Sequence, residues 1–132
     1  MTEKRALQIA VLIACLVPFV AGGGGMIGGQ ATFARHLPFL ADLDSHLRYL
    51  SGLLFAIGLG FLSCVPGIER KGERMTLLSG IVLIGGLARL TGVAIHGLPG
   101  PGHIFGLVME CGVVPALWLW QRRVAARFAG AS

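Results

Sequence analysis

Residues 89–110 read RLTGVAIHGLPGPGHIFGLVME. Two apolar segments meet here at a turn of glycines and prolines, and each carries one charged residue, Arg89 before the turn and Glu110 after it. His96 and His103 flank the turn, each seven residues from one of these charges. If the segments are antiparallel helices, residues equally far from the turn lie at the same depth. The pattern therefore predicts that Arg89 faces Glu110, with His96 near His103 about two helical turns away.

The composition of the chain is that of an integral membrane protein. Hydrophobic residues make up 55% of the 132 residues and charged residues only 13%, and the mean hydropathy is +0.78. Soluble domains contain about 25% charged residues. Four apolar stretches are long enough to cross a hydrocarbon core about 30 Å thick. They are residues 6–24, 46–65, 75–96 and 103–120.

The apolar runs are continuous, which predicts helices and not the alternating strands of a membrane barrel. We therefore predict an all-α membrane protein, a four-transmembrane-helix bundle that forms one domain over residues 1–132. The connection at residues 25–45 mixes apolar, basic and acidic residues. This mixture predicts a short interfacial helix between helices one and two.

The first span admits a second interpretation. Lys4 and Arg5, followed by the apolar residues 6–20, would also fit a secretory signal peptide. We favour a retained helix, because the glycine run at residues 22–25 offers no clear cleavage site and three more spans follow. The same glycines could continue the helix or break it. The sequence leaves this alternative open.

Basic residues predict the orientation, because short loops rich in Lys and Arg stay in the cytoplasm. We expect a bacterial inner-membrane protein with cytoplasmic N- and C-termini and with its four histidines at the outer face. The concentration of basic residues on the cytoplasmic side, together with their attraction to anionic lipid, explains the net charge of +5, so that nucleic acid is not needed as a partner. Eight of the 11 basic residues fall on one side of this scheme: Lys4, Arg5, Arg70, Lys71, Arg74, Arg122, Arg123 and Arg127.

Small residues line the same predicted helix faces as the charges Arg48, Arg89 and Glu110. Such faces let a neighbouring helix approach closely, so we expect the charges to point into the bundle and not towards lipid. The second span shows this most clearly, with small residues at four-residue spacing after Arg48. The residues predicted to pack between helices are Gly52, Ala56, Gly60, Gly85, Gly86 and Gly106.

Two roles are open for the cluster of Arg48, Arg89 and Glu110. An ion pair between helices can simply fix how they pack, since its desolvation cost offsets much of the Coulomb attraction. Alternatively, the two arginines exceed the single glutamate by one positive charge, which leaves a polar notch near the outer leaflet. A guanidinium there could donate two parallel hydrogen bonds to an anionic or carbonyl-bearing amphiphile, such as a lipid, fatty acid or quinone headgroup.

The four histidines suggest a third possibility, a zinc or copper site at the outer face. Their spacing matches no metal motif, and the candidate ligands are His36, His46, His96 and His103. Cys15, Cys64 and Cys111 lack C-x-x-C spacing and are interpreted as small buried hydrophobic residues.

Glu110 is the one carboxylate within the predicted spans, and pairing with arginine would make it a poor proton donor. We therefore predict no catalytic residues and no cofactor. The function we favour is that of a non-catalytic accessory subunit of a larger membrane complex or a small homo-oligomer. Its expected partners are membrane lipid and other membrane subunits or further copies of itself.

Several of these motifs occur together in a known family. HLRYLSG at 46–52, GGLARL at 85–90, GLP at 97–99 and the later Glu110 resemble the bacterial domain-of-unknown-function 4345 family of small four-helix membrane proteins. The likeness covers about residues 44–118. It implies a compact four-helix bundle and no assigned activity. The DoxX-like four-helix membrane proteins are a more distant likeness, similar in size and topology.

Overall fold

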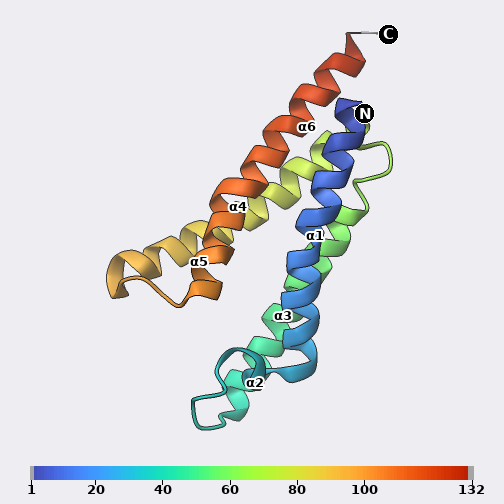
Figure 1. Ribbon diagram of the computed structural model, residues 1–132. Helices are drawn as coiled ribbons and strands as arrows, with labels where there is room; N and C mark the ends of the chain where they lie inside the picture. Colours follow the sequence, from blue (N-terminus) through green and yellow to red (C-terminus); the bar gives the residue numbers. More distant parts are fainter. Residues whose placement is uncertain (1, 131–132) are drawn as a thin grey trace. The chain divides into compact units, whose positions relative to one another are not determined.

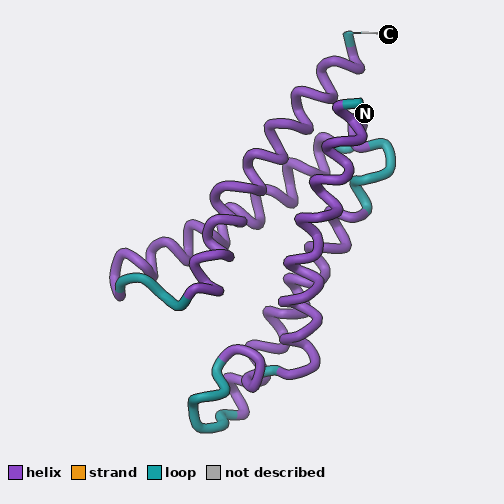
Figure 2. Tube along the Cα trace, viewed as in Figure 1, coloured by secondary structure: helices purple, strands orange, loops and turns teal. Residues whose placement is uncertain are grey.

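The computed structural model describes residues 2–130, and every regular element in this range is helical (Figures 1 and 2). The elements are α1 (Glu3–Gly28), α2 (Gln30–Phe33), α3 (Ala41–Leu62), the 3-10 helix η1 (Ile68–Arg70), α4 (Gly72–His96), α5 (Pro101–Val108), the π-helix η2 (Met109–Val113) and α6 (Val114–Ala129).

Within this range four helical stretches are long and apolar enough to cross a membrane, which indicates a multi-pass membrane protein. They are Glu3–Gly28, Ala41–Leu62, Gly72–His96 and Pro101–Ala129. The all-helical class is thus confirmed, and four helices long and apolar enough to cross a membrane overlap the four predicted stretches. Between the first two spans a helix is present, but it is limited to the four residues of α2.

The chain forms two compact units. Unit 1 contains the residues up to Gln8 together with those from Pro66 onward, and unit 2 is Ile9–Val65. The first turns of α1 therefore belong to unit 1 and the rest of α1 to unit 2. The single four-helix bundle stays a prediction.

In unit 2, α1 and α3 lie side by side and antiparallel (Figure 1). The glycine run is helical, and two of its members, Gly22 and Gly25, lie so close to α3 that a side chain would not fit there. A Cβ on Gly22 would lie 2.8 Å from both the Phe55 nitrogen and the Ser51 oxygen, closer than real side chains come. Nearby, the Phe19 and Phe55 rings pack with centroids 5.2 Å apart. This packing offsets the intrinsic helix cost of glycine, roughly 0.5–1 kcal/mol per residue.

The predicted small-residue row on the second span does not form this contact. A Cβ on Gly52 would meet no atom within 4 Å, and Ala56 is exposed. The face that meets α1 carries Ser51, Phe55 and Gly58 instead. The reason is geometric. In a helix of 3.6 residues per turn, each step of four residues overshoots one full turn by about 40°, so a strict four-residue row gradually turns away from the neighbouring helix. Paired helices stay in contact through a mean spacing near 3.5 residues.

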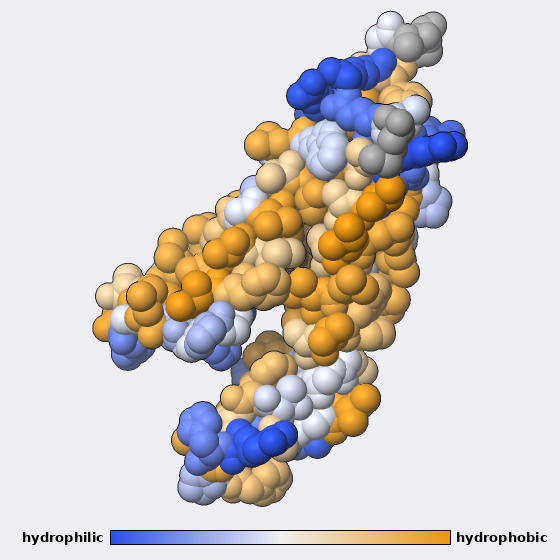
Figure 3. Space-filling model, in the orientation of Figure 1, coloured by the Kyte–Doolittle hydropathy of each residue, from blue (hydrophilic) through white to orange (hydrophobic). Residues whose placement is uncertain are grey.

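In unit 1, α4 and α6 pack antiparallel. Met75, Ser79 and Gly86 are buried on α4, and Leu117, Gln121 and Val124 are buried on α6. Trp118 Nε1 donates to Thr76 Oγ1 at 2.9 Å and so joins the two helices. In Figure 3, hydrophilic residues gather at the end of this unit where α1 begins and α6 ends, and hydrophobic residues cover the helices beyond it.

A π-helical turn joins α5 to α6. The Val114 N–H donates to the Met109 carbonyl, five residues back. Pro115 explains this turn, because proline has no N–H to donate and its ring would clash with the Cys111 carbonyl in a regular α-helix. The turn contains Glu110. π-turns inside helices are frequent at functional sites.

Candidate functional site

Arg89 and Glu110 form a two-bond ion pair between α4 and η2. Arg89 Nε lies 3.0 Å from Glu110 Oε2, and Arg89 Nη2 lies 3.0 Å from Oε1. This fork geometry is the strongest arrangement available to the two side chains. The pair is only partly enclosed, since the Arg89 side chain is 35% exposed and that of Glu110 20%. The predicted facing of these two residues is present in the structure.

His103 is the third member of this site. Its Nδ1 lies 2.9 Å from Arg89 Nη1. A guanidinium can only donate hydrogen bonds, so Nδ1 is the acceptor in this contact. Gly106 lies one turn further along α5, and a Cβ there would come within 3.7 Å of the guanidinium. His96, which was expected beside His103, is exposed at the end of α4.

Gly86 brings the π-turn close to α4. A Cβ on Gly86 would lie 2.7 Å from Cys111 Sγ and 2.8 Å from the Glu110 Cβ. Of the two glycines in the GGLARL motif, this one packs in the interior of unit 1. Gly85 is exposed, and a Cβ there would meet no atom within 4 Å. The proline at position 115 is the sequence signal that could have revealed the π-turn.

Arg48 has a carboxylate of its own in unit 2. Its Nε donates to Asp44 Oδ2 at 2.8 Å, one turn back on α3. Its Nη1 donates to the carbonyls of Met26 and Ile27, both at 2.8 Å. These carbonyls belong to the last turn of α1, where helical hydrogen bonding ends and a cation is favoured by the helix dipole. Arg48 therefore closes the C-terminus of α1.

Gln30 completes this cap, and sequence reasoning missed it. The residue is buried at 3% exposure. Its side-chain amide donates to the Pro38 carbonyl at 2.8 Å and accepts from the Leu40 N–H at 2.9 Å, while its backbone N–H donates to Asp44 Oδ1 at 2.8 Å. One buried side chain thus holds the loop that leads into α3. No local pattern distinguishes this glutamine from a solvent-exposed loop residue.

The four histidines were the candidate ligands for a metal ion. Between Thr2 and Gly130, no three His, Cys, Asp or Glu side chains lie close enough to hold a metal ion together. His36, His46 and His96 are exposed, and His103 contacts Arg89.

A second set of charges lies at the end of unit 1 where α1 begins and α6 ends. Glu3 forms ion pairs with Arg123, at 3.3 Å, and with Arg127. Lys4 Nζ lies 3.0 Å from Glu69 Oε2. Burial would raise the pKa of Glu69, but the Lys4 ammonium, a backbone hydrogen bond and the charge of Arg70 together outweigh this effect and hold the pKa below its ordinary value.

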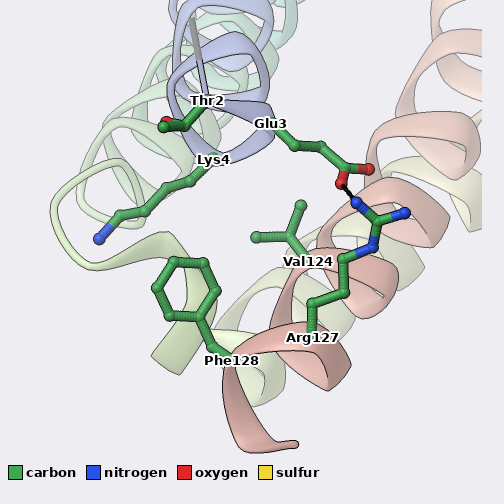
Figure 4. A pocket seen from close by; sticks show the side chains of 6 residues that line it. All are labelled: Thr2, Glu3, Lys4, Val124, Arg127 and Phe128. Atoms are coloured by element: carbon green, nitrogen blue, oxygen red, sulfur yellow. Dashed lines mark hydrogen bonds and ion pairs between the residues drawn. The ribbon is translucent and has the colours of Figure 1, made fainter. Parts of the chain in front are cut away.

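An open pocket of about 240 Å³ lies among these charges (Figure 4). In the figure, Arg127 reaches towards Glu3, while Lys4 points away from them on the side of Phe128. The residues that line the pocket are Thr2, Glu3, Lys4, Val124, Arg127 and Phe128.

Comparison with known proteins gives one match. The family model described as a domain of unknown function, DUF4345, matches residues 6–121. No curated protein and no solved structure matches the chain. The matched range includes the first span, for which the sequence motifs gave no support, and all three residues Arg48, Arg89 and Glu110. The chain therefore belongs to the DUF4345 family.

Proposed function

We propose that this protein is a non-catalytic membrane component that associates with other membrane helices, either as an accessory subunit of a larger complex or as a small homo-oligomer. The observation that carries this proposal is a second, open face on α4. Gly85, Ala88 and Gly92 recur on that face at helical spacing, and a Cβ on either glycine would meet no atom within 4 Å. Small residues at such spacing let helix backbones approach closely in a membrane.

The charges of the candidate site support a non-catalytic role. Both carboxylate oxygens of Glu110 accept hydrogen bonds from Arg89. Both oxygens are thus engaged with the guanidinium, an arrangement that joins two helical segments and leaves neither oxygen directed at a substrate. Arg89 lies beside the open face of α4, so the pair fixes this helix against η2 at the level where another helix would dock.

The proposed location is the bacterial inner membrane, with both termini in the cytoplasm. The support is the distribution of basic residues, which are concentrated before α1, between η1 and α4 and at the end of α6.

The test substitutes Gly85 by Leu and measures the mass of the gently extracted particle by native mass spectrometry. We expect the wild type to be an oligomer or part of a larger complex, and Gly85→Leu to release single chains that keep their helical circular dichroism. Gly80→Leu is the matched control, since a Cβ on Gly80 would also meet no atom within 4 Å, although this residue lies about 140° away around the helix. A wild type that is a single chain without partners would contradict the proposal, as would loss of the fold in Gly85→Leu.

Binding of an amphiphile headgroup at the Arg89 site is the second candidate function. It is favoured by the partial exposure of the ion pair and by His103, which contacts Arg89 through Nδ1 and not through Nε2. Native mass spectrometry of the wild type beside Arg89→Ala and Glu110→Ala tests it. A bound lipid or quinone that is lost in Arg89→Ala, while the fold survives, would support this function. Absence of any bound species in the wild type would reject it.

A further inference from the structure

The whole net charge of the protein lies in one region of unit 1, which we name the basic end. It contains eight basic and three acidic residues, a balance equal to the net charge of +5 of the full chain. Outside it, three basic residues are matched by three acidic ones. The basic residues of this end are Lys4, Arg5, Arg70, Lys71, Arg74, Arg122, Arg123 and Arg127.

The acidic residues of the basic end do not neutralise it. Glu3 is shared by Arg123 and Arg127. Glu69 is shared by Lys4 at 3.0 Å and Arg70 at 3.8 Å. Each of these two carboxylates therefore holds two cations together and leaves one positive charge in excess. Such an arrangement keeps the cations in place without a ligand, yet still attracts an anion.

The pocket between the start of α1 and the end of α6 has both a charged rim and an apolar floor. Val124 is 1% exposed and forms the floor, while the Phe128 ring is 49% exposed at its edge. Lys4 Nζ lies 5.4 Å above that ring. Arg127 stands on the opposite side, with its guanidinium turned to Glu3 (Figure 4). Apolar surface next to cations suits a ligand that is itself part anionic and part apolar.

Trp118 indicates that this pocket lies at the surface of the membrane. Tryptophan is enriched where helices leave the hydrocarbon core. Its ring packs within 6.0 Å of Arg122, and its N–H is bonded to Thr76. Val124 and Arg127 follow Trp118 by about two turns of α6, the level at which lipid phosphates lie.

We propose that this pocket binds the phosphate of an anionic phospholipid. Arg127 and Lys4 bind the phosphate oxygens, and Val124 and Phe128 contact the glycerol and the first methylenes of the acyl chains. Glu3 competes with the phosphate for Arg127. This inference concerns a different site from the proposed assembly face and does not depend on it.

The experiment titrates the full-length protein, in a neutral detergent, with dioleoylphosphatidylglycerol and separately with dioleoylphosphatidylcholine, and counts bound lipid by native mass spectrometry. We expect the anionic lipid to bind more tightly. Arg127→Gln should weaken its binding about fivefold, the usual effect of one basic residue near an anionic lipid surface. Arg35→Gln is the control, because Arg35 is an exposed arginine of unit 2.

Glu3→Gln separates binding from stability. It removes two ion pairs, so a purely structural role predicts weaker folding and no gain in binding. The proposal predicts tighter binding of the anionic lipid, because Arg127 loses its competing carboxylate. Equal binding of the two lipids, or no change in Arg127→Gln and Glu3→Gln, would overturn the proposal. Displacement of the lipid by millimolar inorganic phosphate would also overturn it, since the site would then recognise free phosphate.

Discussion

Arg48 and Arg89 are both arginines of helices that could cross a membrane, yet they bond to different kinds of partner. Arg48 binds a carboxylate on its own helix, and its other hydrogen bonds go to backbone carbonyls at the end of α1. Arg89 binds a carboxylate on another segment through both arms of its fork. One arginine closes a helix end, and the other holds two helices in register. Two arginines that were both predicted on small-residue helix faces therefore have different structural roles.

Arg89→Ala should have the largest effect. It would leave the Glu110 carboxylate without its partner. We expect the free energy of unfolding to fall by about 2 to 4 kcal/mol, somewhat less than for a fully buried pair. Unfolding in sodium dodecyl sulfate, followed by circular dichroism, measures it. The double variant Arg89→Met with Glu110→Leu should recover most of the loss, because it removes both charges together. No recovery would show that the pair does more than hold the helices.

Gly86→Ala should come next. Its methyl group would meet Glu110 and Cys111 at less than 3 Å. We therefore expect overpacking to lower the free energy of unfolding by about 1 to 3 kcal/mol. Gly85→Ala is the matched control on the same helix, and it should be neutral or stabilising by up to about 1 kcal/mol, since alanine favours helix. The same unfolding assay compares them. Equal effects would contradict the assignment of an inner and an open face on α4.

Arg48→Ala should cost less, about 1 kcal/mol, because its side chain is 44% exposed and water can replace part of its hydrogen bonding. The loss should be local. Hydrogen exchange at the last turn of α1 and in the loop held by Gln30 should rise, while exchange in α4 and α6 stays unchanged. A global drop in stability as large as that of Arg89→Ala would remove the distinction between the two arginines.

The smallest effect is expected for the pair of Lys4 and Glu69. Because the pKa of Glu69 is lowered in the folded protein from its ordinary value of 4.5, its contribution to stability is complete above that ordinary value and is lost as the pH falls through the lower folded value. Stability measured from pH 6 down to pH 3 should fall more steeply for the wild type than for Glu69→Gln. Glu73→Gln, at an exposed carboxylate nearby, should retain the wild-type slope. Parallel curves for all three proteins would contradict this expectation.

Part of the candidate site could be predicted from sequence. Arg89, Glu110 and the turn between them are close in the chain, and the spacing of a helical hairpin almost fixes which residues face each other. The bond between His103 and Arg89 could not be assigned in this way, because it depends on the rotamers of two long side chains. The pairing of Arg48 with Asp44 was also missed, although the two are separated by one helical turn, because Arg48 was grouped with Arg89 and Glu110.

By itself the sequence determined the helical class, the number of spans and the asymmetry of charge. These properties depend on hydropathy and length, which each segment carries alone. The tertiary structure decided that the glycine run stays helical and that α3 meets α1 through Ser51, Phe55 and Gly58. Each of these depends on how closely two backbones approach, and that distance is set by both helices together and not by either sequence alone.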